Sequence, residues 1–288
     1  MLTFTIADTD IVWRQADYTP RVGEFSRLFL SDSPRSEHQI AMTGRFADLD
    51  SITALPKLAE EEVYNIHAQA PQRYYLYHWA YLKDAYAVAY HTLSLAGENA
   101  YLFNPAIAKQ PQLNFDWVLG VTGLHKLFLQ LGKAVFHASY IDIGGEALLF
   151  AAPSETGKST QADLWAQYAG AQVINGDRVA IGLKAGRYHA YGYPACGSSG
   201  ICINRTLPIR AIIVLEQGSE NRVLPMTPGE KFRACLSGMV INAWEAEETA
   251  MAMDLAEKWL ENIPIYRFSC RKDADAVATL RRFLEENP

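Results

Sequence analysis

The sequence predicts an α/β chain, α+β overall, in which a smaller β-rich N-terminal domain precedes a larger domain built on a mixed β-sheet. Residues 1–112 carry aromatic and β-branched runs, which suit pleated strands. From about residue 130 onward, apolar runs alternate with helical patterns, joined by short turns and longer crossovers. That mixture favours a mixed sheet over a fully parallel one. We therefore predict two domains, residues 1–112 and 113–288.

The N-terminal domain is predicted to consist mainly of strands, with one helical segment near Leu58–His67. His78 and His91 fall on two of these strands, and we interpret them as polar positions on half-exposed strands rather than as metal ligands. The domain carries no chemical signature of its own. The strands expected here are Leu2–Ile6, Asp10–Trp13, Arg73–Trp79 and Tyr86–Thr92.

A connection at Pro105–Pro111 is followed by the pattern of one amphipathic helix over Phe115–Leu131. Gly132 is its expected C-cap, and we expect this helix to pack the first domain on the second. His125 lies off the apolar stripe, so we expect it at the surface. The stripe consists of Trp117, Val121, Leu124, Phe128 and Leu131.

The second domain is predicted to alternate strands with helices, ending in a terminal helix. The fully apolar strand near residue 210 is expected to lie in the core. The expected strands are Ala134–Ile143, Glu146–Ala151, Gln172–Ile174, Arg178–Leu183, Arg187–Tyr191, Ile209–Leu215 and Ile263–Phe268. The expected helices are Lys158–Tyr168, Ala246–Leu260 and Asp273–Leu284.

Composition and charge exclude several classes of function. Hydrophobic residues make up 49% and the formal net charge is -6, so the sequence indicates a globular chain with no electrostatic case for nucleic acid or anionic membrane. No apolar run reaches the roughly 20 residues of a membrane span, and the first residues lack the pattern of a secretory signal, so we expect a cytoplasmic protein. The four cysteines form no C-x-x-C pair and are expected to be reduced and mostly buried.

The segment after the Glu146–Ala151 strand has the pattern of a phosphate-binding loop that opens a helix. Its backbone N–H groups and the helix N-terminus favour a bound polyphosphate. Lys158 is expected to contact the β- and γ-phosphates and Ser159 to bind Mg²⁺. Ala152 stands where the motif has its first glycine. The residues of this loop are Pro153, Ser154, Glu155, Thr156, Gly157, Lys158, Ser159 and Thr160.

Two further residues are candidates for the chemistry. Asp177 follows an apolar strand downstream of the loop, which is a typical place for a Mg²⁺ ligand or a general base. The alternative is that Asn175 and Gly176 form a hairpin turn and Asp177 is a turn residue. His137 lies on the apolar strand before the loop, where a lone histidine is usually a satisfied core residue.

A loop rich in glycine and serine follows the Arg187–Tyr191 strand and is a possible substrate loop. Arg205 near its end could bind a phosphate in a bidentate manner, whereas the alternative is an ordinary loop with a solvated arginine. The sequence lacks the guanine-binding and eukaryotic protein-kinase motifs. The candidate substrate-loop residues are Cys196, Gly197, Ser198, Ser199 and Gly200.

Taken in order, these segments resemble the C-terminal catalytic domain of HPr kinase/phosphorylase, which is related to ATP-dependent phosphoenolpyruvate carboxykinase. The resemblance covers about residues 130–288 and implies a mixed-sheet P-loop kinase core. The sequence departs from that family at Gly176, which replaces the first of two aspartates, and lacks the acidic residue ahead of its Gly-Ile segment. The segments are His137-Ala138, the phosphate loop, Gly176-Asp177-Arg178, and Gly200-Ile201 through Asn204-Arg205-Thr206-Leu207.

The resemblance implies an ATP- and Mg²⁺-dependent serine kinase acting on a peptide or protein, similar to the kinases that tailor ribosomal peptides of the lasso type. It implies that Asp177 acts as base and Mg²⁺ ligand, that His137 tunes it or shuttles the proton, and that Arg205 contacts the γ-phosphate or the acceptor. Glu155 or Glu216 could supply the missing carboxylate. The N-terminal domain is expected to dock the acceptor, and the resemblance favours a homo-oligomer. A small-molecule hydroxyl kinase and a catalytically silent nucleotide-binding regulator are the alternatives.

Overall fold

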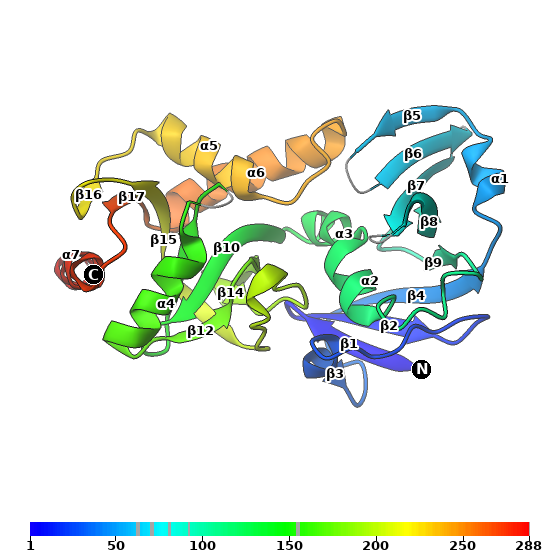
Figure 1. Cartoon of the computed structure of the whole chain (residues 1–288), viewed down its shortest axis with the longest axis horizontal. Coiled ribbons are helices and arrows are strands. Elements are labelled where there is room, and N and C mark those ends of the chain that lie inside the picture. Colours follow the sequence, from blue (N-terminus) through cyan, green and yellow to red (C-terminus); the bar gives the residue numbers. More distant parts are fainter. Residues whose placement is uncertain (62–63, 70–71, 80–81, 92, 154–155, 288) are drawn as a thin grey trace. The chain divides into compact units, whose positions relative to one another are not determined.

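The computed structural model describes residues 1–61, 64–69, 72–79, 82–91, 93–153 and 156–287. It divides into two compact units, Met1–Leu127 and Phe128–Pro288, each with its own sheet (Figure 1). The segment 113–127 thus clusters with the first unit, whereas the sequence assigned it to the second domain. The class of the fold is confirmed: both sheets mix parallel and antiparallel pairs, and the chain is α/β.

The first unit is built on a nine-stranded sheet in the order β3-β1-β2-β4-β9-β8-β7-β6-β5. Strands β2, β4 and β9 pair in parallel, and the remaining neighbours are antiparallel. Two short helical segments, η1 (Ser26–Phe29) and α1 (Asp50–Thr53), connect strands. The strands are β1 (Leu2–Ile6), β2 (Thr9–Arg14), β3 (Leu30–Ser31), β4 (His38–Phe46), β5 (Lys57–Glu60), β6 (Tyr64–Gln69), β7 (Gln72–Trp79), β8 (Leu82–His91) and β9 (Glu98–Phe103).

The helix predicted near Leu58–His67 is wrong, because this segment forms β5 and β6. Strand β6 pairs along β7, which places Ile66 opposite Tyr75 in the interior of the unit. Cross-strand packing of this kind overrides a weak local preference for helix. The ring of His78 stacks on Tyr86 with their centroids 4.5 Å apart. The side chain of His91 lies outside the described residues.

The single helix predicted over Phe115–Leu131 is two helices, α2 (Phe115–Val121) and α3 (Leu124–Gln130). Thr122 is the C-cap of the first helix, where the backbone becomes extended, and its Oγ1 donates to the Val118 carbonyl at 2.6 Å. Gly123 has φ +61°, and a Cβ there would lie 2.6 Å from the Tyr90 ring, so only glycine fits this break. The same break redirects the chain, and His125 is buried rather than exposed.

The second unit has an eight-stranded sheet in which β11, β15 and β17 pair in parallel and the other pairs are antiparallel. The strands are β10 (Ala134–Asp142), β11 (Ala147–Ala151), β12 (Gln172–Asn175), β13 (Arg178–Lys184), β14 (Arg187–Tyr191), β15 (Thr206–Gln217), β16 (Arg222–Leu224) and β17 (Ile265–Cys270). The helices are α4 (Lys158–Ala169), η2 (Gly197–Ser199), α5 (Pro228–Gly238), α6 (Ala246–Asn262) and α7 (Ala274–Glu286).

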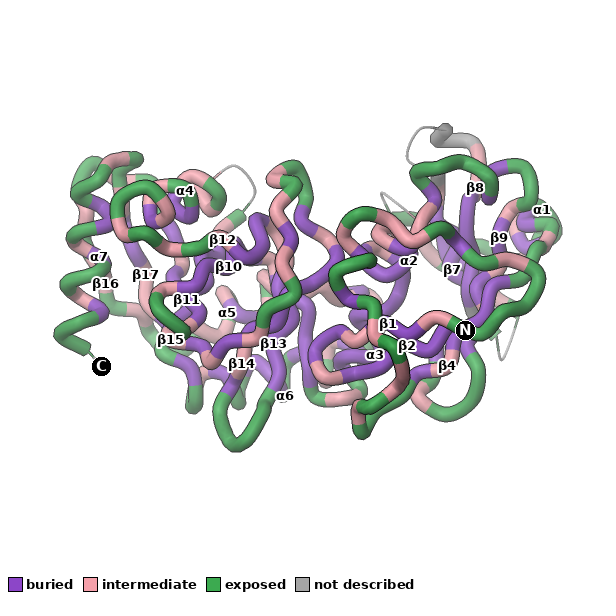
Figure 2. The backbone as a smooth tube through the Cα atoms, turned by 90° about the horizontal axis from the view of Figure 1, so that it is seen from below, coloured by how far each residue is buried: buried purple, intermediate pink, exposed green. Residues whose placement is uncertain are grey.

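Helices cover both faces of this sheet, so its central strands are buried on both sides (Figures 1 and 2). Because successive strand residues face opposite ways, β11 directs Leu149 into the core shared with α5 and α6. Its neighbours Leu148 and Phe150 enter the core shared with α4 and α7. This double burial explains why β11 and residues 211–215 of β15 are continuously apolar.

Sequence analysis missed α5, although Thr227 and Glu230 form a capping box and Pro228 occupies the first turn. The helix ends where Gly238 meets β10. A Cβ on Gly238 would lie 2.2 Å from the Phe136 ring, and Val240 N–H donates to the Val135 carbonyl at 2.8 Å. The absence of a side chain at residue 238 therefore lets α5 reach the sheet.

The four cysteines are free thiols, three of them buried, as the sequence predicted. Burial raises the pKa of the Cys235 thiol to about 12. Within the described part of the chain, no helix combines the length and the apolar character that a membrane crossing requires.

We predict that Gly238→Ala lowers the free energy of unfolding by about 1–3 kcal/mol, because the new methyl group overpacks the Phe136 ring. Urea denaturation followed by circular dichroism measures this. Gly229→Ala in the same helix is the matched control, since a Cβ there meets its nearest atom, the tip of Arg233, only at 3.9 Å. Equal stability of the two variants would contradict the close packing of α5 on β10.

Candidate functional site

The phosphate loop connects the end of β11 to the start of α4. Gly157 is the N-cap of α4 with φ +119°, a conformation that residues with a side chain rarely adopt. Lys158 folds back over the loop, and its Nζ donates to the carbonyls of Ala152 at 2.9 Å and Pro153 at 3.3 Å. Among the described residues no side chain caps α4, so the N–H groups of its first turn suit an anion. Ser154 and Glu155 lie outside the described residues.

The parallel strands bring other segments to the same edge of the sheet. Ala151 pairs with Val214 of β15, and β15 in turn pairs with β17 as far as Cys270. The carboxyl ends of β11, β15 and β17 therefore meet, which is where open α/β sheets bind ligands. Lys272 follows β17 and lines the same cavity as Lys158.

Asp177 lies in line with a strand rather than in a hairpin turn. Both β12 and β13 pair antiparallel with β10: Asn175 lies opposite Tyr140, and Arg178 lies opposite His137. The hairpin alternative for Asn175-Gly176 is therefore wrong, because both flanking strands use the same neighbour. The Ala138 N–H donates to the Asp177 carbonyl at 3.1 Å, which keeps the Gly176-Asp177 segment on β10.

His137 is not a core residue, since its side chain is 43% exposed, and it faces Asp177. Its Nδ1 lies 3.8 Å from Asp177 Oδ1, and Arg178 Nε lies 3.7 Å from Asp177 Oδ2. The nearby His137 is the largest influence lowering the pKa of Asp177, and the charges of Arg178 and Lys158 lower it further against the effect of burial. Burial lowers the pKa of Lys158, while the charge of Asp177 opposes that change.

These shifts indicate a carboxylate that is ionised at neutral pH beside a partly desolvated lysine. A carboxylate with a lowered pKa is a good ligand for a cation and a weak general base. It can still accept a proton late in phosphoryl transfer, when the attacking hydroxyl has become acidic.

Asn175 fixes the position of Asp177 and was missed by sequence analysis, which considered it only as part of a turn. The residue is fully buried. Its Oδ1 accepts from the backbone N–H groups of Asp177 and Arg178, both at 2.9 Å. Its Nδ2 donates to the carbonyls of Tyr193 at 2.9 Å and Ala195 at 3.1 Å. One side chain thus joins the Asp177 segment to the glycine- and serine-rich loop.

The small residues of that loop are required by how closely it packs. A Cβ on Gly176 would lie 2.3 Å from Ser199 Oγ, which itself donates to the Cys196 carbonyl at 2.6 Å. Gly197 has φ +54°, and a Cβ there would lie 2.9 Å from Asp177 Cγ. A larger residue at 176, including a second aspartate, would displace Ser199. At residue 176, where the sequence departs from the HPr kinase pattern, Ser199 of this loop therefore fills the space that a side chain would need.

Two cavities meet at Lys158 and Asp177. The loop cavity has a volume of about 340 Å³ and includes the first turn of α4. The His137 cavity has a volume of about 360 Å³ and includes part of α5. The loop cavity is lined by Gly157, Lys158, Ser159, Thr160, Gly176, Asp177, Cys196, Ser198, Ser199 and Lys272. The His137 cavity is lined by His137, Ala151, Ala152, Pro153, Lys158, Asp177, Val214, Ala234, Ser237 and Gly238.

The structure places Arg205 away from these cavities. Its Nη2 lies 2.7 Å from Asp142 Oδ2, and its Nη1 donates to Gln172 at 3.0 Å. Asp142 pairs with Ala147 at the opposite end of β11 from the loop, about 13 Å away at the rise of a strand. Glu216 lines neither cavity either and lies 3.8 Å from Arg267. The predicted roles of Arg205 and Glu216 in binding phosphate or metal remain predictions.

Comparisons with known proteins found similarity among solved structures alone. No family model matches the sequence, and no curated protein matches it. Among solved structures, the chain is similar to the HPr(Ser) kinase/phosphatase from Coxiella burnetii, with 15% identity and a TM-score of 0.33. The match covers 53% of this chain and 97% of that chain. At this TM-score the likeness supports no inference about activity.

We predict that Asn175→Ala lowers the free energy of unfolding by about 2–4 kcal/mol, because several buried backbone groups lose their partner. Urea denaturation gives the change, and hydrogen exchange over residues 193–203 tests whether the loop opens. Asn262→Ala is the control, since Asn262 is exposed at the end of α6 and donates only to its own helix. An Asn175→Ala variant as stable as this control would contradict the role of Asn175 in joining the Asp177 segment to the loop after β14.

We also predict a pH-dependent contribution of Asp177 to stability. Because the folded pKa of Asp177 lies below its ordinary value of 3.8, its stabilisation is present above the unfolded pKa and is lost as pH falls through the folded pKa. The difference in free energy of unfolding between the wild type and Asp177→Asn is expected to be constant above about pH 5 and to shrink below about pH 4. Urea denaturation across this range measures it, with Asp254→Asn on exposed α6 as control. A difference that grows on acidification would contradict the assignment.

Proposed function

We propose that this chain is an ATP-dependent kinase that transfers the γ-phosphate to a serine hydroxyl of a peptide or protein. The observation that carries the proposal is that Lys158 and Asp177 line both cavities. A donor in the loop cavity and an acceptor in the His137 cavity would meet at these two side chains. The cation then faces the charge that develops on the transferring group, and the carboxylate faces the attacking hydroxyl.

The loop cavity suits the polyphosphate of ATP. The N–H groups at the start of α4 and the Lys158 ammonium would hold the β- and γ-phosphates. Lys272 has no ion pair or hydrogen bond in the described part of the chain, so it is available as a second cation. A nucleotide extending past Gly157 would reach an adjoining cavity of about 240 Å³ that Lys272 also lines.

The residues present fit a Mg²⁺ ion. Ser159 and Asp177 line the loop cavity together, and the lowered pKa of Asp177 keeps its carboxylate ionised. Mg²⁺ is commonly bound by one or two protein oxygens with phosphates and waters completing its shell. When bound, Mg²⁺ would neutralise charge on the phosphates. This protein would use a single aspartate for it, since Gly176 offers none.

The His137 cavity suits a small hydroxyl-bearing side chain. Several lining residues have small side chains or none, among them Pro153, Ala234 and Gly238. The serine oxygen would form its bond to the γ-phosphorus while the bond from that phosphorus to the bridging oxygen of ADP breaks. The hydroxyl proton passes to Asp177, and His137 holds the carboxylate in place. The products are the phosphoserine residue and ADP.

A peptide acceptor is favoured over a small molecule by the first unit. Its sheet ends at β5, whose residues Lys57, Leu58 and Glu60 are exposed. An extended peptide can add to such an edge through backbone hydrogen bonds. Together with the sequence resemblance, this favours acceptors of the class of ribosomally made peptides.

The test is mass spectrometry of serine-containing peptides after incubation with ATP and Mg²⁺. We expect a gain of one phosphate on serine, and we expect Lys158→Met and Asp177→Asn each to lower the rate about 10²–10⁴-fold. Lys258→Met and Asp254→Asn, on the exposed side of α6, are matched controls and should keep full activity.

The alternatives give different results. Phosphorylation confined to small hydroxyl compounds would identify a small-molecule kinase. ATP binding without any transfer would identify a silent regulator. Full transfer by Asp177→Asn, or no binding of ATP with Mg²⁺, would contradict the proposal itself.

A further inference from the structure

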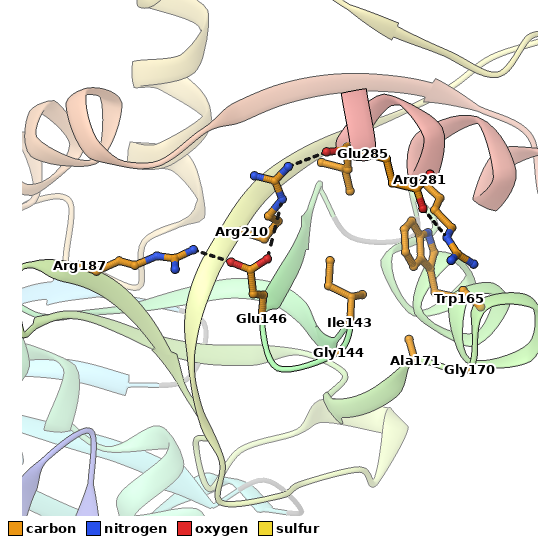
Figure 3. Close-up of a pocket in the computed structure, with 12 residues that line it drawn as sticks. Ile143, Gly144, Glu146, Trp165, Gly170, Ala171, Arg187, Arg210, Arg281 and Glu285 are labelled. Carbon is orange, nitrogen blue, oxygen red and sulfur yellow. Dashed lines mark hydrogen bonds and ion pairs between the residues drawn. The ribbon is translucent and has the colours of Figure 1, made fainter. Parts of the chain in front are cut away.

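A large cavity in the second unit has none of the phosphate-loop residues in its lining, and Figure 3 draws the residues that form it. Its volume is about 760 Å³, within the range of small-molecule sites. The turn between β10 and β11, the C-terminal end of α4, the start of β14, the first half of β15 and the end of α7 form its walls.

This cavity is separate from the candidate active site. Gly144 and Glu146 precede β11, whereas the phosphate loop follows that strand. Helix α4 begins with Lys158 and lines the cavity with Trp165 and Ala169, about 10 and 16 Å further along the helix axis at the rise of a helix. None of the residues that line it lines the loop cavity or the His137 cavity.

The polar side of the cavity holds more cationic than anionic side chains. Arg187 Nη2 lies 2.6 Å from Glu146 Oε1, and Arg210 Nε lies 3.9 Å from the other oxygen of Glu146. Arg281 pairs with Glu285 at 3.0 Å. Three guanidinium groups therefore face two carboxylates, so the lining has an excess of one positive charge.

The guanidinium groups also keep hydrogen-bond donors in reserve. Arg210 uses Nη2 for the carbonyls of Leu284 at 2.5 Å and Asn287 at 2.6 Å, and its Nη1 makes no hydrogen bond within the described residues. Among the described residues, the hydrogen bonds of Arg187 use Nη2 alone, to Glu146 and to the Ile209 carbonyl. Two planar forks with spare N–H groups beside one shared carboxylate match the oxygens of a carboxylate, phosphate or sulfonate.

Apolar side chains line the rest of the cavity. Ile143, Trp165 and Leu284 contribute them, and Figure 3 shows Trp165 beside Arg281, across the cavity from Arg187. Such a surface excludes a bare inorganic anion as the best ligand, because burying apolar area contributes about 25 cal/mol per Å² only to a ligand that has an apolar body.

We propose that this cavity binds a small organic anion, with its anionic head on Arg187 and Arg210 and its apolar body against Ile143, Trp165 and Leu284. The site is independent of the proposed kinase activity, because it shares no residue with the phosphate loop cavities.

The test uses 8-anilinonaphthalene-1-sulfonate, a flat apolar body with one anionic head, in isothermal titration calorimetry. We expect saturable binding of one equivalent. We expect N-phenyl-1-naphthylamine, which has the same body without the sulfonate, to bind at least tenfold more weakly. Equal affinity for the two probes would overturn the anionic part of the proposal.

Variants assign the binding to this cavity. Arg187→Gln should weaken binding at least fivefold, and Ala171→Phe, which fills the cavity from its wall, should abolish it. Arg222→Gln, at an exposed arginine of β16, and Lys158→Met should leave it unchanged. Near-ultraviolet circular dichroism verifies that each variant is folded. Unchanged binding by folded Ala171→Phe, or its loss in Lys158→Met, would overturn the proposal.

Discussion

The candidate site depends on the pairing of two strands along one edge of β10. Strands β12 and β13 both pair with β10, and the short segment between them carries Asp177. The buried Asn175 then satisfies four hydrogen bonds at this point, two to the Asp177 segment and two to the loop after β14. A buried amide with all its partners is rigid and costly to disturb. That rigidity fixes a carboxylate opposite the phosphate loop.

Electrostatics at the site follow from that placement. Asp177 faces His137, Arg178 and Lys158, and together they lower its pKa. Lys158 is partly desolvated, and its ammonium donates to the carbonyls of its own loop. Within the described residues no tight ion pair neutralises this ammonium, which lines the loop cavity. A phosphate entering the loop cavity would replace carbonyl contacts with stronger, charge-assisted ones.

The loop after β14 packs closely against the Asp177 segment because both carry glycine at the points of contact. Gly176 and Gly197 leave room that Ser199 and Asp177 fill. The chain therefore keeps one carboxylate and closes the position of a second. Helix α5 packs on the sheet in the same way at Gly238, because the absence of a side chain there leaves room for the Phe136 ring. Both approaches shape the cavities that meet at Lys158.

The sequence by itself determined the elements whose signals are local. The phosphate loop is contiguous, and the strands around it are apolar on both faces, so pattern alone predicted β11, α4 and the mixed sheet. Capping signals at Thr227 and Glu230 would have revealed α5 as well. Elements whose conformation depends on contacts with distant segments could not be predicted from the sequence pattern. Cross-strand packing against β7 made strands of the segment predicted as a helix near Leu58–His67, and Gly123 broke a helix that its apolar stripe predicted as continuous.

Only the tertiary structure decided which residues meet. His137 and Asp177 are 40 positions apart in the sequence, and strand pairing brings them face to face. The contributions of Asn175, Lys272 and α5 arise from contacts between segments that carry no shared motif. Arg205 shows that a residue can be near the site in the sequence pattern and distant from it in space. Its side chain pairs with Asp142, at the other end of β11 from the phosphate loop. Sequence pattern records local conformation, whereas distances across a sheet depend on register, which the pattern of a single strand does not contain.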